Sequence, residues 1–137
     1  MTTEIGQKII TKIREIAAEK PDFVYQPPVN DYADHCVYVH GGQPSCIVGQ
    51  ALWKLGIIGP SLEVDRTRID DTEPGSGRGL ESSPNRAGSR GLLRYLGLEV
   101  SPEEDDWIRA VQQNQDCAFP WCESVNLADT AVGLADA

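Results

Sequence analysis

Residues 36–56, CVYVHGGQPSCIVGQALWKLG, carry a strand signal, a turn signal and a helix signal in direct succession. Residues 36–39 alternate as in a short strand, and the glycine pair at positions 41 and 42 is typical of a tight turn. An apolar helix then follows. Any site in the first half of the chain is expected at this junction, because three Cys and His side chains flank the turn: Cys36, His40 and Cys46.

The helix of this stretch is predicted over residues 45–55. Ser45 can cap its first N–H groups, and Gly56 can adopt the left-handed conformation that often ends a helix. Gly49 lies inside the helix, where glycine costs about 1 kcal/mol relative to alanine. We therefore expect another backbone, that of the neighbouring ribbon, to approach Gly49 closely.

The residues before this stretch predict one helix and one strand. Isoleucines at positions 5, 9, 13 and 16 form an apolar stripe, which predicts a helix over residues 4–20 that Pro21 ends. Residues 23–25 are β-prone. We expect them to pair with residues 37–39 as a small antiparallel ribbon that lies on the helices.

After Gly56 the sequence predicts a short apolar turn or helix, a polar loop and another helix. Residues 65–79, DRTRIDDTEPGSGRG, have almost no apolar side chains, so we expect a mobile loop there. Ser83 and Pro84 can start the next helix, and Gly97 can end it. Three arginines would form a stripe along this helix: Arg86, Arg90 and Arg94.

The clearest helix start in the chain lies at residues 101–104. Ser101 as N-cap, Pro102 at the first helical position and Glu104 at the third form a capping box, which predicts a helix to about residue 115. A turn should follow, after which Pro120 can open a last helix.

The predicted fold is therefore mainly α (α+β), with about five helices and one small antiparallel β-ribbon between the first two. At 137 residues, with 40% apolar residues, the chain is expected to form a single compact domain over residues 1–137. The expected core draws on one face of each helix: Ile9, Ile13, Ile16, Val48, Leu52, Leu55, Leu92, Leu96, Trp107, Ile108, Val111 and Trp121.

The net charge of −9 is unevenly distributed along the sequence. Residues 1–98 carry 12 acidic and 11 basic side chains, whereas residues 99–137 carry 9 acidic side chains and a single basic one, Arg109. A negative field of this kind repels nucleic acid and anionic membranes and attracts basic partners. Acidity that simply keeps a small protein in solution is the plainer interpretation.

The first 20 residues are charged throughout, so we expect neither a signal peptide nor a membrane anchor. The expected location is the cytoplasm, where the four cysteines would be reduced thiols. A disulfide between Cys117 and Cys122 remains an alternative that this setting disfavours.

Cys46 is the one candidate nucleophile. A helix N-terminus lowers the pKa of a thiol, and His40 is near in sequence, so a Cys-His pair is conceivable. A buried structural cysteine is the competing interpretation, because cysteine is among the most buried residue types. No third orienting residue lies at a recognisable spacing.

A metal site is a weaker possibility at the same turn. Thiolate and imidazole are the preferred ligands of zinc, and four such side chains lie close in sequence: His35, Cys36, His40 and Cys46. A strand and its turn would present these ligands from opposite faces, so we expect neither a metal nor another cofactor.

The two C-terminal helices have the order of a DNA-binding helix-turn-helix, but the last helix has no basic residue for phosphate contacts. Sequence-specific DNA binding is therefore not expected. A protein partner with a basic surface fits the charge better. The carboxylates expected to contact it are Glu103, Glu104, Asp105, Asp106, Glu123 and Asp129.

The segments DFVYQPP, CVYVHGGQPSCIVGQALWKLG and AVQQNQD, with Pro120-Trp121 after the last, resemble a group of small uncharacterised proteins of actinobacteriophages and their actinobacterial hosts. The resemblance covers residues 21–59 and 107–125. It implies a phage or prophage accessory gene in an actinobacterial cytoplasm, and no established activity comes with it.

Three hypotheses of function follow. The leading one is a non-enzymatic protein-binding module that modulates a host protein through its acidic C-terminal helices. A cysteine-dependent enzyme centred on Cys46 and His40 is the second, and thiol reactivity separates the two. The third is a virion or assembly protein, which would form a stable homo-oligomer; the sequence does not fix the oligomeric state.

Overall fold

The computed structural model describes residues 2–26, 37–70 and 81–133. In chain order the elements are α1 (Glu4–Glu19), β1 (Val39–His40), β2 (Gln43–Pro44), α2 (Ile47–Lys54), α3 (Ser61–Val64), β3 (Ile69–Asp70), β4 (Glu81–Ser82), α4 (Ser89–Tyr95), α5 (Pro102–Asp116) and α6 (Trp121–Val132). The prediction of a mainly helical fold, with a small antiparallel ribbon between the first two helices, is confirmed. No helix in these ranges is long and apolar enough to cross a membrane.

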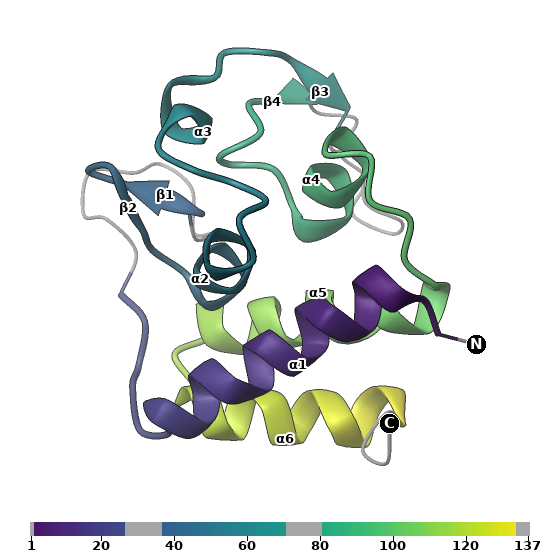
Figure 1. Cartoon of the computed structure of the whole chain (residues 1–137). Coiled ribbons are helices and arrows are strands. Elements are labelled where there is room, and N and C mark those ends of the chain that lie inside the picture. Colours follow the sequence, from purple (N-terminus) through teal and green to yellow (C-terminus); the bar gives the residue numbers. More distant parts are fainter. Residues whose placement is uncertain (1, 27–36, 71–80, 134–137) are drawn as a thin grey trace.

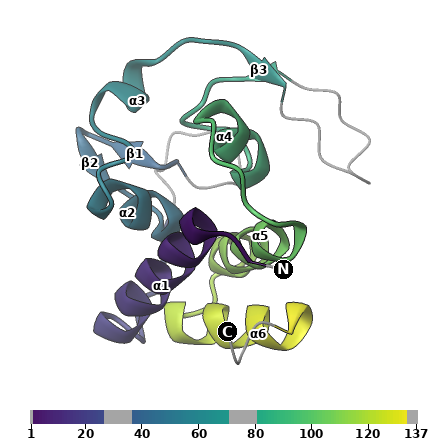
Figure 2. The ribbon, with the colours of Figure 1, turned by 45° about the vertical axis from the view of Figure 1, so that its right-hand side comes forward.

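Three helices form the base of the molecule. Helices α5 and α6 run antiparallel, and α1 packs against both of them (Figure 1). Helix α2 lies on α1 and α5, while α4 packs against α5 near its beginning (Figure 2). Buried side chains from all six helices join one hydrophobic cluster.

The ends of the three long helices follow local sequence signals. Thr3 caps α1 by accepting a hydrogen bond from the N–H of Gly6, and Ser101 and Glu104 form the predicted capping box of α5. Helix α6 begins after Pro120 and ends at Gly133, which has a positive φ of 79°. These three helices lie within one or two residues of their predicted positions.

The predicted partner of the first strand is wrong. Strand β1 pairs with β2, in the register Val39↔Pro44 and His40↔Gln43, whereas residues 23–25 form no strand. The intervening glycines 41 and 42 both have positive φ, 61° and 76°, so the chain can reverse within two residues. Local pairing across that turn leaves the Phe23 carbonyl free to accept the N–H of Trp121 instead.

A second small ribbon was not predicted. Strands β3 and β4 pair antiparallel, and they bracket most of the segment expected to be a mobile loop. Residues 71–79 of that loop lie outside the described residues. At its beginning, Asp65 accepts hydrogen bonds from the N–H of Thr67 and the hydroxyl of Tyr95 on α4.

Helix α2 begins with Cys46 as its N-cap, not with Ser45 as predicted. The Ser45 hydroxyl is instead hydrogen bonded to the hydroxyl of Tyr25, at 2.8 Å. The first N–H of the helix, that of Ile47, donates to the side-chain oxygen of Gln115 on α5 at 2.8 Å. A residue 68 positions away therefore caps this helix.

The prediction that a backbone approaches Gly49 is confirmed. A Cβ atom added at this position would lie 2.8 Å from the Cα of Tyr38, immediately before β1, and would also meet its carbonyl group. Carbon atoms in real structures do not approach so closely, so only glycine allows α2 to pack against this segment.

The predicted start of the fourth helix at Ser83 and Pro84 is wrong, since α4 begins at Ser89. Residues 84–86 form a turn, in which the Asn85 side chain accepts the N–H of Val39 and donates to its carbonyl, both at 2.8 Å. Asn85 thereby provides hydrogen-bond partners for both the N–H and the carbonyl of Val39 in β1. Because Arg86 lies in this turn, the predicted arginine stripe does not form along α4.

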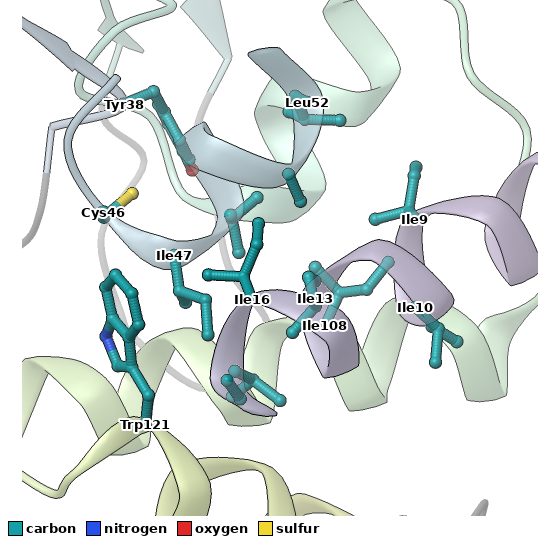
Figure 3. Close-up of a cluster of buried hydrophobic side chains, with 14 of the residues drawn as sticks. Ile9, Ile10, Ile13, Ile16, Tyr38, Cys46, Ile47, Leu52, Ile108 and Trp121 are labelled. Carbon is teal, nitrogen blue, oxygen red and sulfur yellow. The ribbon is translucent and has the colours of Figure 1, made fainter. Parts of the chain in front are cut away.

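The core matches most of its predicted members. All are buried except Leu55 and Leu96, which are half-buried at the ends of their helices. The close-up in Figure 3 shows the isoleucines of α1 facing Ile108 and the residues of α2. Tyr38, which the sequence did not place in the core, is fully buried; its hydroxyl donates to the Ala87 carbonyl and accepts from Gln112.

Candidate functional site

The Cys46 thiol, the weak candidate for a nucleophile, lies inside the core. Its side chain lies among the buried hydrophobic residues and has no exposed surface (Figure 3). Its Sγ lies 3.7 Å from the side-chain oxygen of Gln112. His40 is exposed on β1. A substrate cannot reach the sulfur without opening the core, so the structure favours the buried structural cysteine over the catalytic one.

This burial predicts the reactivity of the thiols. Native protein treated with iodoacetamide should be alkylated at Cys117 and Cys122, which are exposed and free, while Cys46 reacts at least about a hundredfold more slowly than a free thiol. Peptide mass spectrometry after timed quenching measures each rate. Denatured protein, in which Cys46 should react like the others, is the control. A native Cys46 that reacts as fast as Cys117 would revive the enzyme hypothesis.

Of the four weak candidates for metal ligands, His40 is exposed and Cys46 is buried in the core. His35 and Cys36 lie outside the described residues, and within those residues no group of three His, Cys, Asp or Glu side chains could hold a metal ion. The backbone N–H groups of the turn next to His40 are bound by a carboxylate from α3. The carboxylate of Glu63 on α3 accepts the N–H groups of Gly41 and Gly42, at 2.8 and 2.9 Å, and these bonds lower the pKa of Glu63.

The six carboxylates predicted to bind a partner do not form one surface. Glu103 and Glu123 are exposed at the beginnings of α5 and α6, which are opposite ends of the antiparallel pair (Figure 1). The other four make contacts inside the molecule: Glu104, Asp105, Asp106 and Asp129. These four carboxylates therefore do not belong to a common binding face.

Glu104 joins the beginnings of two helices. Its side chain is fully buried and accepts hydrogen bonds from the N–H and hydroxyl of Thr3, the amide of Gln7 and the N–H of Ser101, at distances between 2.7 and 3.2 Å. Burial alone would raise the pKa of Glu104, but these hydrogen bonds outweigh it and lower the pKa to about 2. A carboxylate held in this way cannot contact a partner.

Asp129 fixes α6 to α1 and α5. Both of its oxygens accept from the guanidinium of Arg14, at 2.8 and 2.9 Å, and one also accepts the indole N–H of Trp107. The Arg14 guanidinium lies 4.9 Å from the centre of a Trp107 ring, which adds a cation-π contact. The hydrogen bonds from Arg14 are the main reason why the pKa of Asp129 is lowered.

Asp105 and Asp106 are paired with arginines. Arg90 of α4 binds Asp105 through Nε and lies 3.4 Å from Asp106 through Nη2, and Arg109 lies 3.5 Å from Asp106. Asp105 is mostly buried, while about half of the Asp106 side chain is exposed. Two of the four consecutive negative charges are thus balanced by two arginines.

A hollow of about 770 Å³ lies beside this charge network, between the end of α4 and the beginning of α5. Leu93, Leu98 and Val100 give it an apolar floor, since Leu93 is buried and the other two are half-buried. Arg94 on α4 and Glu99 in the connection between the helices line the same hollow, and both are exposed. Within the described ranges neither has an ion-pair partner. This hollow, together with the exposed Glu103, which follows the lining residue Pro102 in the sequence, is the candidate functional site.

Sequence reasoning missed most of this site. Arg94 was placed only on a predicted stripe, and Leu98, Glu99 and Val100 were assigned no role. No local pattern signals the hollow, because it exists only where the residues after Gly97 bring α5 back against α4. Arg90 and Asp105, which form the nearby ion pair, are 15 residues apart in the sequence.

Comparisons with known proteins assign the chain to no family. The chain matches no family model, no curated protein and no solved structure.

Proposed function

We propose that this protein is a non-enzymatic binding module that engages a basic surface of another protein at the beginning of α5. The resemblance noted in the sequence would make it a small phage-type accessory protein and its partner an actinobacterial host protein. The contact would be acidic, as the sequence suggested, but it would lie at one end of the α5–α6 pair and would not involve all six carboxylates.

The observation that carries the proposal is the pair of exposed carboxylates at this end. Glu99 lines the hollow and Glu103 follows the lining residue Pro102 in the sequence, and neither glutamate has an ion-pair partner among the described residues. Asp105 and Asp106, in contrast, are balanced by arginines. Charges that lack an internal partner remain available to another molecule. The net charge of −9 would also steer a basic partner toward the protein.

The test is a titration with a defined basic probe, a short peptide of lysine and glycine, followed by amide NMR at about 0.02 and 0.15 M salt. Shifts should concentrate at residues 97–106. The double variant Glu99→Gln and Glu103→Gln should bind about fivefold more weakly at low salt, because each exposed charge pair contributes about 0.5 kcal/mol.

The matched control removes two other exposed carboxylates, by Asp22→Asn and Glu123→Gln. It changes the net charge equally at the other end of the α5–α6 pair, so its affinity should stay close to that of the parent. If the two double variants weaken binding by the same factor, the peptide responds only to total charge and the proposed contact at α5 is wrong.

A further inference from the structure

We infer that the hollow between α4 and α5 receives an extended peptide segment in which an aliphatic side chain lies between an acidic and a basic residue. This inference rests on the proposed function, because it describes the segment of the partner that the same site would bind. It also adds to that function an apolar contact and a preference for a segment that carries both charges.

The floor of the hollow determines the central residue of the segment. Leu93, Leu98 and Val100 are aliphatic, and Pro102 at the start of α5 adds further apolar surface at the rim. A volume of about 770 Å³ lies within the range of sites that hold small ligands or side chains. An aliphatic side chain placed there would lose its contact with water, which favours binding.

The two charged side chains that line the hollow without an ion-pair partner determine the flanking charges. Arg94 projects from α4 and Glu99 from the connection that leads into α5, and they are not paired with each other although both line the hollow. Arg94 would attract a carboxylate, and Glu99 would attract an ammonium or guanidinium group. Arg90 and Asp105 also line the hollow, but they already form an ion pair.

An extended peptide can meet all three requirements at once. Its residues i, i+2 and i+4 point to the same side, so an acidic, an aliphatic and a basic residue separated by single residues can face the hollow together. A peptide of glutamate, leucine and lysine, with a glycine between each and blocked ends, is therefore the probe. NMR titration measures its affinity.

The parent protein should bind this peptide about tenfold more tightly than the same peptide with alanine in place of leucine. The parent protein should also bind the glutamate-leucine-lysine peptide more tightly than peptides that carry two lysines or two glutamates around the leucine. Arg94→Glu should reverse the preference between the mixed-charge and the two-lysine peptide, in favour of the two-lysine peptide. Glu99→Lys should favour the two-glutamate peptide.

The control is Arg66→Glu, which makes the same charge change at an exposed arginine outside the hollow and should leave the order of the peptides unchanged. Arg94 and Glu99 are exposed, and thermal unfolding will verify that their variants fold. If the leucine peptide has no advantage, or Arg94→Glu leaves the order unchanged, the inference is wrong. The lysine and glycine peptide tests the proposed function separately, since it needs neither the hollow nor Arg94.

Discussion

Replacing Gly49 by alanine is expected to destabilise the protein by about 3 kcal/mol, although alanine is the better helix former. Helix propensity alone predicts a gain of about 1 kcal/mol for this change in α2. The new Cβ would meet the backbone of Tyr38, at 2.8 Å from its Cα and 2.9 Å from its carbonyl carbon. A backbone cannot turn away as a side chain can, so α2 and the segment before β1 would have to separate.

Tyr38 has little room to yield. Its ring is fully buried, its hydroxyl is hydrogen bonded to Ala87 and Gln112, and its carbonyl accepts the N–H of Ser45 at 2.9 Å. Moving this segment would therefore disturb several contacts at once. For this reason the expected loss of stability is larger than that of an ordinary substitution at the protein surface.

Urea denaturation followed by tryptophan fluorescence measures the free energy of unfolding. Gly59→Ala is the matched control, because a Cβ at Gly59 would meet nothing within 4 Å and the backbone there does not require glycine. It should change the stability by less than about 1 kcal/mol. A Gly49→Ala protein as stable as the Gly59→Ala protein would contradict the close packing of α2 on Tyr38.

Replacing Glu104 by glutamine is expected to cost about 3 kcal/mol of stability at neutral pH. The carboxylate has a pKa of about 2 in the folded protein, against an ordinary value of 4.5. The difference corresponds to about 3 kcal/mol in favour of the ionised form. A neutral amide would also direct its own N–H groups toward the donors of Thr3, Gln7 and Ser101.

The same shift predicts a pH dependence with a definite sign. Because folding lowers the pKa of Glu104, its contribution is complete above about pH 4.5 and is lost as the pH falls toward 2. The parent should lose this contribution across that window. In the glutamine variant the corresponding part of the acid sensitivity should be absent, so the two stability curves should converge at low pH.

Glu103→Gln is the control for this experiment. It alters the adjacent residue of the same helix, but Glu103 is exposed, so its loss should cost less than about 1 kcal/mol. Urea denaturation at several pH values between 2 and 7 supplies all three curves. Parallel curves for the parent and the Glu104→Gln protein would show that the carboxylate does not hold α1 and α5 together as described.

The sequence was sufficient where a structural signal is local. The isoleucine stripe of α1 and the capping box of α5 lie within one helix, and the stop at Gly97 needs only the residue itself, whose φ is 74°. Such signals depend on hydrogen bonds and side-chain spacing over three or four residues, so they survive without knowledge of the rest of the fold.

The sequence was insufficient where a residue has its partner far away. It placed Cys46 at a helix start, but its burial and the capping of α2 by Gln115 follow from the packing of α5 on α2. It predicted a ribbon but not the partner of β1. The two-residue turn at Gly41 and Gly42 lets β2 pair with β1 in place of residues 23–25.

The candidate site shows the same division most clearly. Sequence alone determined that the C-terminal residues are acidic, because charge is a property of composition. Only the tertiary structure decided which carboxylates remain available, since Arg14 and Arg90 reach Asp129 and Asp105 from distant parts of the chain and Glu104 is enclosed between two helix ends. Ionic contacts form wherever packing brings charges together, and packing is decided by the whole chain.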